Sequence, residues 1–419
     1  MSKVNSDKIY DAAIVGSGPG GSSTAFYLSK LGRSVVILEK EKLPRRKICG
    51  DAISQIAQKH LTKMGVLQEI LEEKKGHWAE IGGLISPSRI TYIDNSAEVI
   101  GSHLMISIKR QIMDEKMVRA AEREGAHLLE EYNVKEVKFS EEDKIWTIVS
   151  QDDSKKKIKA KVLVAADGAV SKIARSLGIV DSPPKAVSSS VYIKAGTHQF
   201  KEDGVCIYTQ DILPGYTALF KEADGDLVFC CYIIPGGRYK TSDLQHVHLS
   251  FLSGEPYLSR ALGPNAKIEK MNSAPLRLGG VKKSYANHLL IVGDAAGMID
   301  PLTGEGIQYA MDAGEIAANV LDEAFDEDDL SEKFLKRYQK KWMKTFGRDF
   351  KWSTRMVKVL AKKPIFIDAF AQLCNDKGPS YMIMWAKIMT GSQSKLSFFK
   401  PRLAVPLLLT SLKLSLKKK

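Results

Sequence analysis

Four residues near the N-terminus have the types and the spacing that bind the phosphates and a ribose of a dinucleotide. Gly16, Gly18 and Gly21 follow an apolar run, and Glu39 ends the next apolar run. The first glycine permits a tight turn, the second lets the backbone approach a pyrophosphate, and the third lets a helix lie close to a sheet. The N-terminus of that helix offers free N–H groups to the phosphates, and Glu39 can accept hydrogen bonds from the ribose. The segment therefore predicts a nucleotide-binding strand, turn, helix and strand, against the alternative of a chance glycine turn.

A second group of polar and glycine residues suits the rest of such a cofactor. The apolar run 289–292 ends at Gly293 and Asp294, and Gly304-Glu-Gly306 opens a segment with helical periodicity from Ile307. Asp294 can accept hydrogen bonds from polyol hydroxyls such as the ribityl chain of FAD. A helix starting at Gly304 would direct its positive end at a flavin ring, where negative charge develops on reduction. A nicotinamide dinucleotide has no use for this element, so the pattern favours FAD. The alternative is a buried strand, turn and helix capped by Asp294.

Two further segments place charged residues beside these elements. The run 162–166 leads through Asp167 and Gly168 into a helix start, which repeats the strand, turn and helix pattern. Arg110 stands at the start of an amphipathic helix over 109–125, where a guanidinium can bind a phosphate. Taken alone, Arg110 is better interpreted as a solvated surface charge.

Together these segments resemble the geranylgeranyl reductase family, which belongs to the flavoproteins with the p-hydroxybenzoate hydroxylase fold. The resemblance covers about residues 8–325. It is carried by GSGPGG at 16–21 with Glu39, by Pro44-Arg-Arg-Lys-Ile-Cys-Gly50, by Ala166-Asp-Gly168 and by GDAAGMIDPLTGEGI at 293–307. It implies an α/β fold, α+β overall, in which a Rossmann-like FAD-binding domain is interleaved with an antiparallel substrate-binding sheet. A helical C-terminal region follows.

The resemblance also implies which residues contact the cofactor. They are Gly16, Gly18, Gly21, Glu39, Lys40, Cys49, Gly50, Ala52, Arg110, Val134, Asp294, Gly306 and Ile307. Gly21 and Glu39 would hold the adenosine half, Val134 would pack near the adenine, and the loop 49–52 would face the flavin. Cys49 is either redox-active or, as is commoner for cysteine, a small residue with an inert thiol.

The region expected to face the substrate departs from the family's pattern. Family members often carry Tyr-x-Trp-x-Phe-Pro on the sheet that faces the flavin. This chain has Tyr216 and Phe220, with Ala218 in place of the tryptophan and Lys221 in place of the proline. Tyr216 and Phe220 are therefore the implied substrate-binding residues, against the alternative that they only pack within a strand. No catalytic residue is assigned, because the sequence does not identify a proton donor.

The predicted organisation is interleaved. Residues 8–85, 105–180 and 285–325 are expected to form the FAD-binding domain, and 86–104 with 183–284 the substrate-binding sheet. Residues 326–419 are expected to be helical. The segment 134–149 predicts a hairpin beside the cofactor.

The composition is that of an intracellular globular enzyme. The five cysteines have no metal-ligand spacing, which argues against a metal site and against a secreted disulfide framework. The N-terminus has no apolar signal segment, which predicts a cytoplasmic location. No nucleic-acid motif accompanies the net charge of +13, so no nucleic-acid partner is expected.

The C-terminal segment 397–419 mixes bulky apolar residues with lysines and contains no acid. Its longest uncharged run, 403–412, contains Pro406 and is too short for a bilayer span, which needs about 20 residues. The segment suits the surface of an anionic membrane, with apolar groups in the acyl boundary and lysines on the headgroups. The alternative is a buried C-terminal helix with a solvated lysine tail.

The resemblance implies an FAD-dependent reductase that saturates carbon–carbon double bonds of a hydrophobic, isoprenoid substrate by hydride transfer from reduced flavin. The expected reductant is NADPH, bound transiently, or a small electron carrier, because no second nucleotide motif is apparent. One alternative is a monooxygenase or halogenase of the same fold, although the halogenases' Trp-x-Trp-x-Ile-Pro signature is absent. The other is a non-catalytic flavin-binding protein at a membrane.

Overall fold

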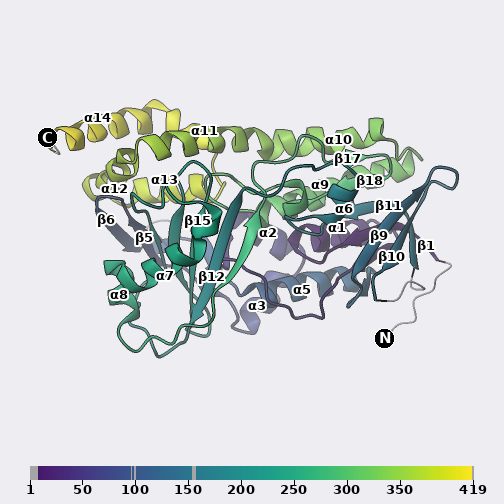
Figure 1. Cartoon of the computed structure of the whole chain (residues 1–419), viewed down its shortest axis with the longest axis horizontal. Coiled ribbons are helices and arrows are strands. Elements are labelled where there is room, and N and C mark those ends of the chain that lie inside the picture. The colour runs from purple at the N-terminus through teal and green to yellow at the C-terminus, as the bar shows by residue number, and fades with distance from the viewer. Residues whose placement is uncertain (1–7, 96, 99–100, 153–156, 418–419) are drawn as a thin grey trace.

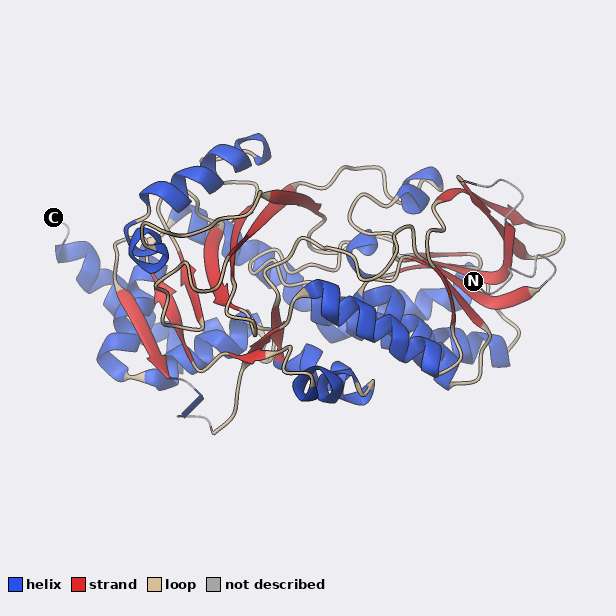
Figure 2. Ribbon diagram, turned by 90° about the horizontal axis from the view of Figure 1, so that it is seen from below, coloured by secondary structure: helices blue, strands red, loops and turns tan. Residues whose placement is uncertain are grey.

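The computed structural model describes residues 8–95, 97–98, 101–152 and 157–417. Figure 1 shows an elongated molecule in which two sheet-containing parts lie side by side, with helices of the C-terminal region along one edge. Figure 2 shows from below that strands occupy both halves and that long loops run between them. This arrangement confirms the predicted mixed fold, in which two interleaved parts precede a helical C-terminal region.

The part that the sequence predicts to bind the nucleotide, here called the nucleotide-binding part, is built on a mainly parallel sheet. Within the described residues its strands are β1 (Ile9–Val15), β2 (Val35–Leu38), β8 (His127–Leu129), β9 (Val134–Ser140), β10 (Ile145–Ser150), β11 (Lys157–Ala165), β17 (Tyr285–Ala286) and β18 (Leu289–Ile291). β1 pairs in parallel with β2 and β11, and β11 pairs in parallel with β18. The expected hairpin is present as β9 and β10, and β10 joins the sheet antiparallel to β11. The central strands read as apolar runs because they are buried.

Helices complete this part. α1 (Pro19–Lys30) packs against α5 (Arg110–Arg123) and α9 (Ile307–Asp326), and the short α6 (Lys172–Ser176) follows β11. α9 begins at Ile307 and not, as the sequence predicts, at Gly304. Gly304 has a left-handed φ of 70°, which is incompatible with a right-handed helix.

The second sheet is mostly antiparallel. Its strands, in spatial order, are β16 (Asn272–Leu276), β12 (Ala186–Ile193), β15 (Leu227–Ile233), β14 (Tyr216–Lys221), β13 (Gly204–Ile207), β5 (Ile81–Ile85) and β6 (Thr91–Asn95). β5, which the sequence placed in the nucleotide-binding part, instead pairs in parallel with β13 and antiparallel with β6. One face of this sheet packs against α7 (Leu244–Gly254) and α8 (Pro256–Leu262) through a core that includes Leu219 and Phe229.

A small sheet links the two parts. It consists of β3 (Ala52–Ser54), β7 (Met105–Ser107) and β4 (His77–Trp78). Between β3 and β4 the chain forms α2 (Gln55–Lys63) and α3 (Val66–Glu72). Because β3 directly follows the loop 44–51, this sheet fixes the end of that loop.

The C-terminal helices are α10 (Glu332–Trp342), α11 (Arg348–Lys362), α12 (Ile365–Lys377), α13 (Pro379–Met389) and α14 (Pro401–Lys417). α12 packs against β6, α13 and α14, around a core in which Phe370, Trp385 and Phe398 are in ring contact. Phe398 thus belongs to a core, although the sequence placed it in the segment expected at a membrane. Among the described helices, none has both the length and the hydropathy to cross a bilayer.

Candidate functional site

A cavity of about 540 Å³ lies between the two sheets. Its walls come from the turn between β1 and α1, the loop after β2, the loop 166–173 after β11, the strands β14 and β15, and the loop 299–307 before α9. The carboxyl ends of the parallel strands β1, β2, β11 and β18 therefore open toward one face of the second sheet. This is the position at which open α/β sheets bind ligands.

The glycine turn has the geometry that a phosphate requires. Gly16 has a φ of 103°, and a Cβ there would lie 2.4 Å from the Ala166 carbonyl oxygen. A Cβ at Gly21 would lie 1.9 Å from the Gly16 carbonyl oxygen, so the third glycine permits the close packing that the sequence predicts. A Cβ at Gly18 would meet no protein atom within 4 Å, and Gly18 caps α1 without a side-chain hydrogen bond. The first turn of α1 therefore leaves both space and free N–H groups for an anion.

Glu39 is held in place by a polar network. One carboxylate oxygen accepts hydrogen bonds from the Ser17 hydroxyl at 2.6 Å and the Ser17 amide at 3.1 Å, and Arg45 lies 3.3 Å away. The other oxygen accepts from the Glu41 amide at 3.1 Å. Burial alone would raise the pKa of Glu39, but the Arg45 charge and these hydrogen bonds lower it below its usual value. An ionised carboxylate retains acceptor capacity for a ribose diol.

The loop after β2 places the Cys49 thiol near a buried guanidinium at the start of α5. Arg110 is buried and makes a two-pronged ion pair with Asp114, with distances of 2.8 and 2.9 Å, so it is not the surface charge that it resembles in isolation. Arg110 and Cys49 both line the cavity, and the guanidinium charge favours the ionised form of the thiol. Despite this neighbour, desolvation raises the pKa of the Cys49 thiol to about 11. A thiol with this pKa is protonated at neutral pH, which favours the inert interpretation of Cys49.

The start of α9 combines an acid and a positive helix end. Among the described residues, no donor bonds the Asp294 carboxylate, which lies next to Gly306 and remains available to polyol hydroxyls. The carboxylate of Glu305 accepts from the Gln308 amide at 3.1 Å and so caps the first turn of α9. Burial raises the pKa of Glu305 to about 7, although hydrogen bonds from the Gln308 and Ile307 amides oppose the shift.

The opposite wall is apolar and aromatic. Tyr216, Phe220, Cys230 and Tyr232 project from β14 and β15 into the cavity. The Tyr216 hydroxyl donates to the Thr303 carbonyl at 2.5 Å, and the Tyr232 hydroxyl donates to the Pro301 carbonyl at 3.3 Å. These bonds fix the aromatic wall to the loop before α9. Ala218 shares their face but is fully buried and does not line the cavity.

The structure brings nearly all the predicted site residues together. Gly16, Gly18, Glu39, Lys40, Cys49, Gly50, Ala52, Arg110, Val134, Tyr216, Phe220, Asp294, Gly306 and Ile307 line this one cavity, and Gly21 packs behind it. The residues fit FAD, because the uncapped start of α1, the open space in front of Gly18 and the polyol acceptor Asp294 line the same cavity. Their individual contacts with the cofactor stay predictions.

Sequence reasoning missed several lining residues. Arg45 lies inside the motif at 44–50, Asp51 directly follows it, and Glu305 lies inside the motif at 293–307. The two motifs thus predict where these residues lie, but not what their side chains do. Tyr232 had a weaker signal, because it belongs to an apolar run that reads only as a strand.

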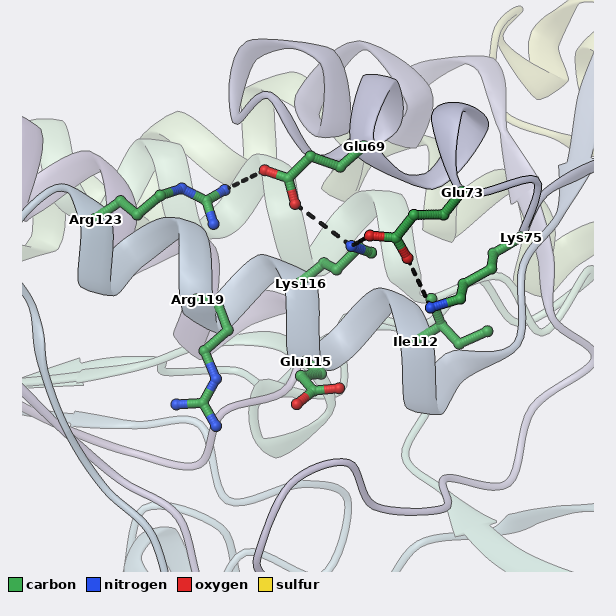
Figure 3. A pocket seen from close by; sticks show the side chains of 8 residues that line it. All are labelled: Glu69, Glu73, Lys75, Ile112, Glu115, Lys116, Arg119 and Arg123. Carbon is green, nitrogen blue, oxygen red and sulfur yellow. Dashed lines mark hydrogen bonds and ion pairs between the residues drawn. The ribbon is translucent and has the colours of Figure 1, made fainter. Parts of the chain in front are cut away.

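A second hollow, between α3 and α5, has a different character (Figure 3). Glu69 binds Arg123 at 2.6 Å, and Glu73 binds Lys116 at 2.5 Å and Lys75 at 2.6 Å. Most of its charges are thus paired with one another, and its lining is almost wholly charged. We therefore assign the functional site to the cavity between the sheets.

Comparisons with known proteins agree with this geometry. The sequence model of a family described as an FAD binding domain matches residues 9–344. A Dictyostelium discoideum protein named conditioned medium factor receptor 1 is 46% identical over 405 residues, which cover 94% of this chain and 79% of that protein. Digeranylgeranylglycerophospholipid reductase 2 of Methanopyrus kandleri is 29% identical over 359 residues, or 84% of this chain and 87% of that enzyme.

A solved structure shows the same fold over almost the whole chain. The crystal structure of a geranylgeranyl bacteriochlorophyll reductase-like protein from Thermoplasma acidophilum superposes with a TM-score of 0.77 at 20% identity. The match covers 96% of this chain and 99% of that one. The C-terminal helices are thus part of the shared fold.

Proposed function

The chain belongs to the geranylgeranyl reductase family of FAD-dependent oxidoreductases, and we propose that it saturates carbon–carbon double bonds of an isoprenoid lipid. The observation that carries this proposal is the aromatic wall opposite the nucleotide-binding residues. A Cβ at Gly50 would lie 3.6 Å from the Phe220 ring and 3.2 Å from the Cys230 sulfur, so the loop 49–52 and this wall enclose the same space. Such a space suits a prenyl chain better than a polar substrate.

The protein's own groups would bind and orient the reactants. FAD, when bound and reduced, supplies the hydride that saturates the double bond. The start of α9 stabilises negative charge next to it, and Tyr216 and Tyr232, fixed by their hydroxyls, present apolar ring surfaces to the substrate. The reductant that we propose is NADPH, bound transiently, or a small electron carrier.

Anaerobic turnover tests the proposal. The purified protein, reduced with dithionite, is mixed with a digeranylgeranylglycerophospholipid, and the lipid is analysed by mass spectrometry. We expect a gain of about two mass units per saturated bond, since each step adds a hydride and a proton. Hydroxylated or halogenated product formed only with oxygen would instead show a monooxygenase or halogenase.

A second candidate is a flavin-binding receptor without turnover. The observation that favours it is the name of the relative that is 46% identical, which describes a receptor and no reaction. A protein whose bound flavin neither NADPH nor dithionite reduces would support this candidate, whereas lipid saturation would reject it.

We also propose that α14 docks on an anionic membrane surface. Val405, Leu409, Leu412 and Leu416 are all more than half exposed and recur at helical spacing on α14, and Lys413 and Lys417 lie on the same helix. Only Leu403 and Ser411 of α14 are buried. Both alternatives that the sequence offers therefore apply in part, because one edge of the helix packs on the protein while Leu409, Leu412 and Leu416 remain exposed. A prenyl lipid could then enter the protein without crossing water.

A further inference from the structure

A buried carboxyl group stands at the edge of the candidate cavity. Asp51 is fully buried, lines the cavity and has a left-handed φ of 58°, a conformation that aspartate tolerates better than most residues. One carboxylate oxygen accepts from the Tyr192 hydroxyl, and the other lies 3.4 Å from the Arg110 amide. These two donors favour the ionised form of Asp51.

A second buried carboxyl group lies on the neighbouring sheet face. Side chains alternate along β14, so Glu222, just beyond the strand, lies on the same face of the sheet as Tyr216, Ala218 and Phe220. Glu222 is 1% exposed, and among the described residues neither of its carboxyl oxygens has a hydrogen-bond partner. A buried carboxylate without donors is costly, and the group avoids this cost by holding a proton.

The strand register brings the two carboxyl groups into one cluster. Phe220 pairs with Val228, and Val228 pairs with Tyr192, so these three residues form a row across the sheet. The loop covers this row, because Gly50 lies over Phe220 and Asp51 bonds Tyr192. Glu222 is the next position on the same face.

The neighbouring cations are already paired. Lys109, from the start of α5, binds Asp224 at 2.5 Å and Asp226 at 2.8 Å in the turn after β14. Arg110 pairs with Asp114, and Lys194 from the end of β12 contacts Asp226 at 3.3 Å. Arg46 and Lys109 lie over the Tyr192 ring, and Arg46 also contacts Glu269 at 3.3 Å. In the described part of the chain, the cluster therefore has no unengaged cation to neutralise a second buried carboxylate.

We propose that Glu222 stores a proton and that Asp51 conveys it from there into the cavity, to the substrate carbon next to the one that receives the hydride. The inference rests on the proposed function and names the proton donor that the sequence did not reveal. The hydride leaves reduced FAD and forms one new C–H bond, the proton forms the other, and the double bond becomes single. The flavin is left oxidised and the carboxyl pair is left with one proton fewer, which solvent restores. A rotation of the Glu222 carboxyl, or one bridging water, would join it to Asp51.

The electrostatics agree with this assignment. Burial raises the pKa of Glu222 well above its usual value, and the charge of Asp51 raises it further. Burial also raises the pKa of Asp51, while the Tyr192 hydrogen bond and the Arg110 charge oppose the shift. Glu305 is the competing acid of the cavity, but its carboxylate already caps α9.

Infrared spectroscopy of the FAD-loaded, oxidised protein tests the stored proton without turnover. We expect the carbonyl band of a protonated carboxyl group, shifted in D2O, that disappears in Glu222→Gln and persists in Asp51→Asn. Glu142→Gln, in the exposed turn between β9 and β10, serves as the control and keeps the band. An unchanged band in Glu222→Gln would show that Glu222 does not hold the proton.

Single-turnover oxidation of dithionite-reduced protein by a digeranylgeranylglycerophospholipid tests the transfer. We expect the rate to fall about 10²–10⁴-fold in Asp51→Asn and in Glu222→Gln, at equal FAD content, and to stay unchanged in Glu142→Gln. In Tyr192→Phe, Asp51 loses a donor to its charged form, so the fall of rate at high pH should move to higher pH.

The outcomes separate the two proposals. Saturation by the wild type with wild-type rates in Asp51→Asn, or a large loss confined to Glu305→Gln, overturns the proton path and leaves the proposed function intact. A wild type that shows the infrared band but saturates no prenyl lipid overturns the proposed function and the transfer to a substrate.

Discussion

The Lys395 ammonium lies 3.0 Å from the Asp300 carboxylate, and both side chains are fully buried. The contact is a close ion pair and not a well-directed hydrogen bond, since the ammonium has no aligned acceptor among the described residues. Asp300 also accepts from the Leu302 amide at 2.8 Å and the Ser353 hydroxyl at 2.9 Å. The pair therefore ties the segment before α14 to the loop that lines the candidate cavity.

Breaking this pair should destabilise the protein strongly. Lys395→Met leaves a buried carboxylate without its counter-ion, and we expect the free energy of unfolding to fall by about 3–5 kcal/mol. Urea unfolding followed by flavin and tryptophan fluorescence measures the change. The double variant Lys395→Met/Asp300→Asn removes both charges and should recover part of the loss. Equal stability of Lys395→Met and wild type would show that the pair contributes nothing.

Removing acceptors for the cofactor hydroxyls should weaken FAD binding. Glu39→Ala and Asp294→Ala each remove a charged acceptor, and we expect FAD affinity to fall about 10–100-fold, which corresponds to about 1.5–3 kcal/mol. Flavin fluorescence on dilution or dialysis measures the dissociation constant. Glu142→Ala, on the exposed hairpin turn, is the control and should retain FAD. Wild-type affinity in both site variants would remove these residues from the cofactor site.

The sequence predicted the local parts of this site well and the long-range parts poorly. The segments around Gly16 and Asp294 carry their own strand, turn and helix periodicity, so each is readable in isolation. The position of β5 depends on pairing with β13, more than a hundred residues later, and no local pattern encodes it. No local pattern shows that Lys395, a lysine just before the basic C-terminal segment, is buried against Asp300. Nor does one show that Glu222 is buried beneath the loop that covers its sheet. Local periodicity identifies elements, whereas tertiary contacts decide which isolated charges become functional.

Asp203 should make stability depend on pH in the acid range. It accepts hydrogen bonds from His77 at 2.7 Å and from the Ile81 amide at 2.9 Å, where β5 meets β13. Burial alone would raise the pKa of Asp203, but the hydrogen bonds from His77, Ile81 and Glu80 lower it well below its usual 3.8. A lowered folded pKa contributes stability that is present above the unfolded pKa and is lost as pH falls through the folded pKa.

The variant Asp203→Asn isolates this contribution. We expect it to lower the free energy of unfolding by about 1–3 kcal/mol at pH 7, and the difference from wild type to shrink as pH falls below about 4. Chemical unfolding at a series of pH values measures it. A difference that grows toward acid pH would contradict the assignment.

The aromatic wall should control which substrate the cavity accepts. Phe220→Ala removes a ring that faces the loop at Gly50, so the cavity widens while the nucleotide-binding residues stay in place. We expect FAD to remain bound and the preference among prenyl chain lengths to change. Phe229→Leu, on the opposite face of the same sheet, is the matched control and should lower stability without changing the preference. Identical product distributions for Phe220→Ala and wild type would place the substrate elsewhere.

The exposed face of α14 should determine binding to anionic membranes. Deleting the segment from 397 onward would also remove Phe398, which packs 5.7 Å from Trp385 in ring-centroid distance, so point variants give the sharper test. Each basic residue near an anionic surface contributes about 1 kcal/mol, so Lys413→Glu/Lys417→Glu should lower vesicle affinity at least tenfold. Leu409→Ser/Leu412→Ser should also release the protein, because it removes apolar burial in the acyl boundary.

Co-sedimentation with vesicles containing phosphatidylserine measures both effects, with FAD content as the check on folding. High salt should weaken wild-type binding without abolishing it, since salt screens the lysines but not the leucines. Equal pelleting of wild type and both variants would show that α14 does not bind the membrane.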